Sequence, residues 1–210
     1  MYRIIVIIFI PLLAFSVSCQ SYALNLLDEE TINKAKQGNA DAQYYLGNMY
    51  FHGEGVPQDY KQAFYWYEKS AQQGDTGGQF SLGDMYFHGK GVPQDYKQAF
   101  YWYEKFAQQG GAIAQVILGN MYFHGKGVPQ DYKQAFYLYK KSAQQGEVVA
   151  QDTLGRMYFD GKGVPQDYKH AYIWFNVAAA QGFEEAKKAR DMTAEHLTPA
   201  ALAEAQTLSH

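Results

Sequence analysis

Three histidines stand 36 residues apart, and an aspartate continues the series one interval further on. They are His52, His88 and His124, followed by Asp160. Imidazole and carboxylate groups are common zinc ligands, so the chemistry to weigh here is a row of metal ions. Neighbouring helices in a stack lie about 8–10 Å apart, which is too far for one ion to be shared between successive positions. We therefore interpret these residues as helix ends beside turns, and we expect neither a metal site nor a cofactor.

Two lysine patterns suggest anion binding, and both have a simpler interpretation. Gly-Lys-Gly occurs at 89–91, 125–127 and 161–163, but it follows a predicted helix and lacks the G-x-x-x-x-G-K-[ST] pattern of a phosphate loop. Lys61 recurs every 36 residues with an aspartate two residues before each copy, which favours a solvated face. The whole chain has a formal net charge of -3, so we do not expect it to bind nucleic acid.

Three tryptophans, Trp66, Trp102 and Trp174, share one position of the same period. A row of indoles could stack on sugars, which gives one alternative function, an envelope glycan-binding or cell-wall-modifying protein. Packing between helices is the interpretation that we favour. No Ser-His-Asp order, paired-carboxylate motif, H-E-x-x-H or cofactor fingerprint occurs. We therefore assign no catalytic residue and do not expect an enzyme.

The first 23 residues have the pattern of a secretory signal. Arg3 is the only charge before Asp28, and an apolar run from Ile4 to Val17 follows it. This run is shorter than the roughly 20 residues that span a bilayer. Small residues at the positions that signal peptidase reads place the expected cut after Ala23, which predicts a periplasmic or secreted protein. Two alternatives stay open, an uncleaved anchor and a lipid anchor at Cys19.

A period of 36 residues organises the rest of the chain, whose 47% hydrophobic content excludes wholesale disorder. The string G-V-P-Q-D-Y-K begins at Gly55, Gly91, Gly127 and Gly163. The four repeats are therefore residues 39–74, 75–110, 111–146 and 147–182. We expect residues 24–38 to form an N-terminal half-repeat cap and residues 183–210 to form C-terminal capping helices, with Thr198 capping the last one.

Each repeat is predicted to contain two helices. Ala42 and Leu46 lie on the apolar stripe of the first helix. Glycines at its C-terminus end this helix. Asp59 opens the second helix, and Gln62 is expected to complete a capping box by bonding back to the Asp59 backbone N–H. In repeat 4 His170 replaces the glutamine, so we expect that return bond to be lost. A unit this short buries its apolar face only against its neighbours, which predicts an all-α solenoid of helix-turn-helix repeats.

The repeated skeleton resembles the Sel1-like repeat family, relatives of the tetratricopeptide repeats. The matching positions in repeat 1 are Ala42, Leu46, Gly47, Tyr50, Gly53, Gly55, Val56, Asp59, Ala63, Trp66, Ala71 and Gly74. The resemblance implies a right-handed α/α superhelix that acts as an adaptor between proteins, in a family whose bacterial members are often exported. A cysteine-rich branch is associated with β-lactam binding, but this chain lacks its cysteines. Gly77 and Gly78 depart from the pattern and predict a soft first helix in repeat 2.

Four positions of the first helix change between repeats, whereas the rest of that helix hardly changes. One is occupied by Asp41, Gly77, Ile113 and Val149. The other three supply the candidate contact residues: Tyr44, Phe80, Val116 and Asp152; Tyr45, Ser81, Ile117 and Thr153; and Asn48, Asp84, Asn120 and Arg156. Spacings of three and four put all of these on one face of the helix. Drift on a solvated surface is the alternative interpretation, but several of these side chains are too apolar to favour it.

The function that we expect is that of an exported repeat scaffold or adaptor. In the family the first helices line the concave side, so this stripe would bind a protein or peptide in the groove. Tyrosine suits such a surface because it adds contact area at a small cost in conformational entropy. Besides the glycan-binding alternative, a lipid-anchored assembly factor remains open, and its membrane contact would run through Cys19.

Overall fold

A computed structural model of the chain describes residues 29–208. The predicted signal, the cleavage site after Ala23, Cys19 and the first residues of the 24–38 cap lie outside the described residues. Every regular element between residues 29 and 208 is an α-helix, and this part of the chain contains no strand. The predicted all-α class is therefore confirmed.

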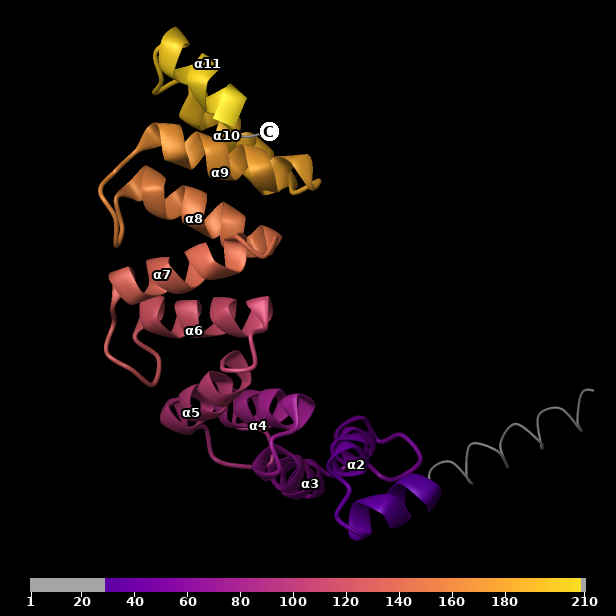
Figure 1. Cartoon of the computed structure of the whole chain (residues 1–210). Helices are drawn as coiled ribbons and strands as arrows, with labels where there is room; N and C mark the ends of the chain where they lie inside the picture. Colours follow the sequence, from indigo (N-terminus) through magenta and orange to yellow (C-terminus); the bar gives the residue numbers. More distant parts are fainter. Residues whose placement is uncertain (1–28, 209–210) are drawn as a thin grey trace, which may run out of the picture. The chain divides into compact units, whose positions relative to one another are not determined.

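Ten complete helices follow a helical stretch at residues 29–36 in the described part of the chain (Figure 1). They are α2 (Ala40–His52), α3 (Tyr60–Gln72), α4 (Thr76–His88), α5 (Tyr96–Ala107), α6 (Ala112–His124), α7 (Tyr132–Ala143), α8 (Val148–Asp160), α9 (Tyr168–Ala180), α10 (Glu184–Ala194) and α11 (Pro199–Leu208). Each repeat supplies two of them, and the predicted helix-turn-helix architecture is confirmed.

The chain divides into two compact units, unit 1 up to Gly78 and unit 2 from Gln79 onward, so the boundary falls inside α4. The two adjacent glycines of this helix are the last residues of unit 1 and pack closely inside it. A Cβ atom at Gly77 would lie 2.8 Å from the Tyr44 ring, and one at Gly78 would lie 2.7 Å from the Ala71 backbone nitrogen. Their lack of a side chain therefore has a packing reason.

Within unit 2, α6, α7, α8 and α9 lie side by side in chain order (Figure 1). The core between them consists of small and large side chains that alternate, such as Ala135, Tyr139 and Leu154, all buried. In each repeat a glycine of the first helix lets an aromatic ring of the second helix come close to the first helix. A Cβ atom at Gly155, for example, would lie 2.7 Å from the Phe175 ring. Close packing of this kind leaves no room for an added methyl group.

Glycine and aspartate end and begin the helices as predicted, but the capping box is incomplete. The Asp59 carboxylate accepts from the backbone N–H groups of Lys61 and Gln62 at 2.9 and 3.1 Å. The predicted return bond from Gln62 to the Asp59 N–H is wrong, because that N–H donates to the Tyr50 carbonyl at 2.9 Å. The turn brings the start of α3 against the end of α2, so the backbone group already has a partner.

The glutamine of the G-V-P-Q-D motif also caps the first helix, a role that the sequence did not reveal. Gln58 Nε2 donates to the Phe51 carbonyl at 2.9 Å. The same contact joins Gln166 to the Phe159 carbonyl at 2.7 Å in repeat 4. The last turn of a helix leaves carbonyl groups without intrahelical partners, so these bonds fix the turn to the helix end.

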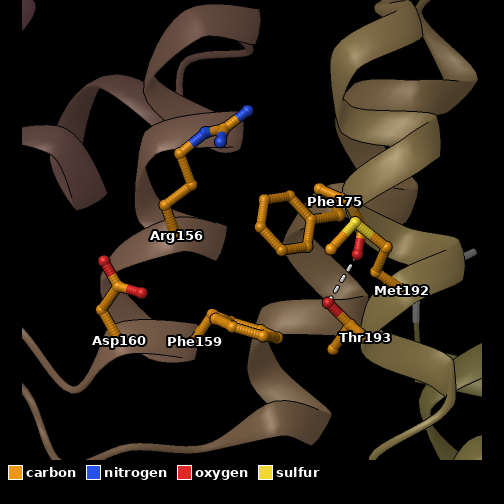
Figure 2. Close-up of a pocket in the computed structure, with 7 residues that line it drawn as sticks. Arg156, Phe159, Asp160, Phe175, Met192 and Thr193 are labelled. Carbon is orange, nitrogen blue, oxygen red and sulfur yellow. Dashed lines mark hydrogen bonds between the residues drawn. The ribbon is translucent and has the colours of Figure 1, made fainter.

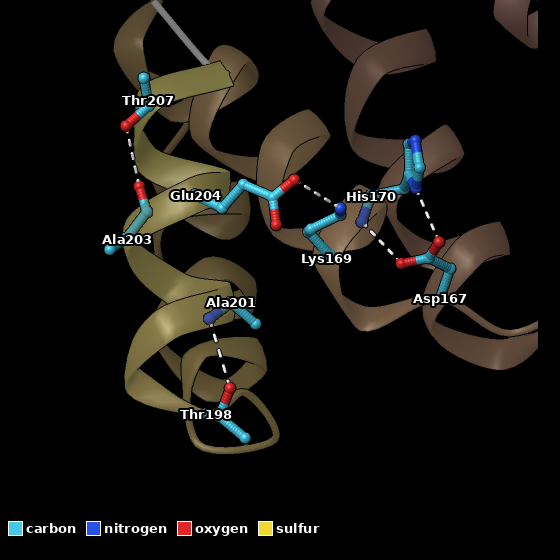
Figure 3. A network of polar contacts seen from close by, with 8 residues as sticks. All are labelled: Asp167, Lys169, His170, Thr198, Ala201, Ala203, Glu204 and Thr207. Carbon is cyan, nitrogen blue, oxygen red and sulfur yellow. Dashed lines mark hydrogen bonds and ion pairs between the residues drawn. The ribbon is translucent and has the colours of Figure 1, made fainter.

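The C-terminal helices α10 and α11 both pack on α9. Thr198 caps α11, as predicted, because its hydroxyl accepts from the Ala201 backbone N–H at 3.3 Å. Lys169 of α9 donates to Glu204 of α11 at 3.0 Å, which ties the last helix to the repeats (Figure 3).

Candidate binding site

Three hollows lie on the first helices of unit 2, one between each successive pair. Hollow A, between α4 and α6, has a volume of about 240 Å³; hollow B, between α6 and α8, about 270 Å³; and hollow C, between α8 and α10, about 230 Å³. We call the surface that the lining residues of these hollows define the first-helix face.

The hollows are built from the same repeat positions. The end of each first helix supplies Phe87, Phe123 and Phe159 in hollows A, B and C. The second helix supplies Tyr103, Tyr139 and Phe175, and the next first helix supplies Met121, Met157 and Thr193. The hollows are therefore a consequence of the 36-residue period and recur along the face with an apolar base and a polar rim.

Hollow C has an apolar base formed by two phenylalanine rings. Figure 2 shows the rings of Phe159 and Phe175 directed toward the space between α8 and α10, with Met192 on its far side. Arg156 stands on the rim of α8, and Thr193 turns its hydroxyl to the Ala189 carbonyl of its own helix at 2.6 Å. The polar atom of Thr193 is therefore satisfied inside the helix, which leaves the wall apolar.

Six of the twelve predicted contact residues line these hollows. They are Phe80, Asp84, Ile117, Asn120, Thr153 and Arg156. Of the others in unit 2, Ser81 is half-buried, and Val116 packs against the core cluster that contains Tyr139. In unit 1, Tyr45 is 59% exposed, whereas Tyr44 is half-buried with its ring centroid 6.0 Å from that of Tyr67.

One row of predicted contact residues also has a packing role. The buried Tyr67 hydroxyl donates to Asn48 at 2.7 Å, and the buried Tyr139 hydroxyl donates to Asn120 at 2.8 Å. Burial of a hydroxyl without a partner is unfavourable, so this position must carry an acceptor wherever the second helix carries tyrosine. Desolvation raises the pKa of the Tyr139 hydroxyl above its usual range.

Repeat 4 changes both members of that pair. Phe175 has no hydroxyl, and Arg156 replaces the acceptor. Arg156 instead donates through Nε to Asp152 at 2.7 Å. Asp152 is 7% exposed, so it offers a ligand little surface; its carboxylate holds the guanidinium in place on the rim.

Repeat 2 differs again, because Asp84 takes the place of asparagine. Its carboxylate lies 3.4 Å from the Tyr103 hydroxyl and 3.3 Å from His88 Nε2. Burial, reinforced by the negative charge of Asp84, raises the pKa of Tyr103. Asp84 therefore places a carboxylate on the rim of hollow A where the neighbouring repeats present a neutral amide.

The remaining motifs resolve into structural roles. Lys126 of Gly-Lys-Gly lies over the Phe87 ring at 4.9 Å and the Tyr96 ring at 5.4 Å, so it joins one repeat to the one before. Trp66 and Trp174 pack against core clusters, as predicted.

Between residues 29 and 208 no group of three or more His, Cys, Asp or Glu side chains is placed to hold a metal ion. No helix in that range is long and apolar enough to cross a bilayer.

The family model of the Sel1 repeat matches residues 40–75, 77–111, 112–147 and 148–183. These ranges cover most of the chain. The protein belongs to the Sel1 repeat family. Proteins with Sel1 repeats generally mediate protein–protein interactions, and the family consists mostly of non-catalytic scaffolds.

Two solved Sel1 structures resemble this chain well. One is a protective antigen present in uropathogenic Escherichia coli strains, with 41% identity over 76% of this chain and a TM-score of 0.73. The other is a Sel1 repeat protein from Oxalobacter formigenes, with 35% identity over 71% of this chain and a TM-score of 0.67. The matches cover only 34% and 60% of those chains. No curated protein matches the sequence.

Proposed function

We propose that this Sel1 repeat protein is an exported scaffold that binds a protein or peptide on its first-helix face. The observation that carries the proposal is the row of hollows A, B and C, each with an aromatic base and a polar rim. Their volumes of about 230 to 270 Å³ suit single side chains, whereas sites for small molecules usually measure about 300–1,000 Å³. A ligand that fills successive hollows would be a chain with side chains at intervals.

Export is supported by the sequence alone. An apolar run between Arg3 and the small residues before Ala23 is typical of a secretory signal. The intact mass of the protein recovered from producing cells tests this part of the proposal. A mass that begins after Ala23 supports it, a lipid adduct at Cys19 indicates an anchored protein, and a full-length mass contradicts cleavage.

Partner capture with matched variants tests the binding surface. The groove variant combines Phe80→Ala and Ile117→Ala, which remove apolar side chains from hollow A. The control variant combines Tyr101→Ala and Tyr137→Ala, two tyrosines on second helices that are 47% and 61% exposed and line none of the three hollows.

We expect the control variant to capture the same partners as the unmodified protein and the groove variant to lose them. Loss through unfolding is separated by circular dichroism, which must show equal helix content for all three proteins. If two well-folded variants capture identical partners, the assignment of binding to the first-helix face is wrong.

A further inference from the structure

One position on the rim of hollow A differs in charge from the equivalent position of the other repeats. The position carries Asn48 in repeat 1, Asp84 in repeat 2, Asn120 in repeat 3 and Arg156 in repeat 4. Asp84 is therefore the single carboxylate in a row that is otherwise neutral or basic. Its side chain is 35% exposed, so a ligand can reach it.

No lysine or arginine neutralises this carboxylate within the part of the chain that the structure describes. The side chain that pairs with it is His88, whose Nε2 lies 3.3 Å from Asp84 Oδ1. Lys126 also lines hollow A, but its ammonium lies over the rings of Phe87 and Tyr96. By contrast, the carboxylates beside hollows B and C are paired, Asp152 with Arg156 and Asp160 with Lys162.

The walls of hollow A suit the stem of a cationic side chain. Phe80, Tyr103, Ile117 and Met121 provide aromatic and aliphatic contacts below the carboxylate. Lysine and arginine bury their methylene stems along such surfaces while the charged head stays at a polar rim, and aromatic faces attract the charge. Asp84 and His88 are two potential metal ligands, but among residues 29–208 they belong to no group of three or more that could hold a metal ion.

In hollow C, two repeats further along, both charged rim residues are paired, Arg156 with Asp152 and Asp160 with Lys162. The base of hollow C consists of Phe159, Phe175 and Ala189, and Met192 on its wall is 62% exposed. An exposed methionine beside aromatic rings provides an adaptable surface for a large apolar side chain. The first-helix face therefore presents, at a fixed separation, hollow A with a rim carboxylate that has no lysine or arginine as an ion-pair partner, and hollow C, whose rim charges are paired.

Between hollows A and C, the polar side chain of Asn120 lines both hollow A and hollow B. Its Oδ1 accepts from the Tyr139 hydroxyl, which turns its amide nitrogen away from that tyrosine. An extended polypeptide has backbone carbonyls that need donors, and an amide held in this way can provide one.

From this arrangement we propose that the ligand is an extended peptide segment with a lysine or arginine in hollow A and a large apolar side chain in hollow C. The inference rests on the proposed function, because it assumes that the first-helix face binds a polypeptide. Charge complementarity with Asp84 decides between a basic segment and an acidic or neutral one.

Selection from a displayed library of random 12-residue peptides tests the inference without knowledge of the natural partner. The purified protein, an Asp84→Asn variant and a Glu104→Gln variant are panned in parallel. Asparagine stands at the equivalent positions of repeats 1 and 3 and accepts the tyrosine hydroxyl there, so Asp84→Asn is expected to fold normally. Glu104 is exposed on α5 and lines none of the hollows, so its variant controls for the lost charge.

We expect peptides selected on the unmodified protein to be enriched in a basic residue followed or preceded at a fixed interval by a large apolar one. The best peptide, measured by fluorescence anisotropy, should bind Asp84→Asn about fivefold more weakly, as for a partly exposed ion pair, and Glu104→Gln unchanged. Replacing its basic residue by glutamine should weaken binding to the unmodified protein by the same factor and have no effect on Asp84→Asn.

Equal selection of basic residues by Asp84→Asn, equal losses in both variants, or no selected peptide would each overturn the inference. Neutral peptides that bind the unmodified protein and are lost with Phe80→Ala and Ile117→Ala would overturn the charge rule while the proposed function stands. The proposed function fails separately, if the groove variant and the unmodified protein capture the same partners.

Discussion

The tyrosine–asparagine pair between the two helices of repeat 3 provides a quantitative test of the packing. Tyr139 is 1% exposed, and its hydroxyl donates to Asn120 at 2.8 Å. Asn120→Ala removes the acceptor and leaves the hydroxyl without a partner, which should lower the free energy of unfolding by about 1–2 kcal/mol. Tyr139→Phe removes the donor, while the exposed Asn120 amide stays hydrated, so the expected loss is about 1 kcal/mol.

The double variant decides whether the two losses have one cause. If the hydrogen bond is the shared origin, Asn120→Ala should cost almost nothing in the Tyr139→Phe background, with a coupling energy of about 1–2 kcal/mol. Repeat 4 supplies a natural parallel, because it replaces the pair with Phe175 and Arg156. Urea unfolding, followed by circular dichroism and fitted with one m-value, measures the free energy of unfolding of all four proteins. Losses that simply add would refute the account of this position as a packing constraint.

Three further predictions concern other contacts within unit 2. Gly155→Ala should lower the free energy of unfolding by about 1–3 kcal/mol, because its Cβ atom would lie 2.7 Å from the Phe175 ring; urea unfolding with no loss would contradict this contact. Burial raises the pKa of Tyr139, so its contribution to stability is complete below the unfolded value of about 10 and falls as the pH rises above it. Thermal melts between pH 8 and 11 should therefore decline less steeply in Tyr139→Phe than in the unmodified protein, and equal slopes would argue against the burial. Lys126→Gln should cost about 0.5–1 kcal/mol through its lost contact with Phe87, and a variant as stable as the unmodified protein would show that the contact contributes nothing.

The fold could be predicted from the sequence because its signals are local and repeated. Glycines at fixed spacing, an aspartate before each second helix and an apolar stripe at helical period each act within a few residues. The error at Asp59 came from a longer contact, since its N–H finds the Tyr50 carbonyl across the turn. Local spacing shows which groups can bond but not which competing partner the turn brings closer.

The candidate site was predictable only in part. Comparing the repeats identified Phe80, Ile117 and Asn120, which do line the hollows, but variation alone could not separate exposed residues from residues that change in pairs. Asp152 is the example, because it changed together with Arg156 and is buried beneath it. The signal was present as the simultaneous loss of tyrosine at 175 and asparagine at 156, but it required knowing that the two positions touch. The cation–aromatic contacts of Lys126 were hidden for the same reason.

Site-specific photo-crosslinking in the producing cell tests the central claim most directly. A benzophenone amino acid is placed at Ile117, which lines hollow A, or at Tyr137, which is 61% exposed on a second helix and serves as the matched control. We expect crosslinked polypeptide from position 117 and none from position 137. Crosslinks from position 137 alone, or equal crosslinks from both, would contradict binding on the first-helix face.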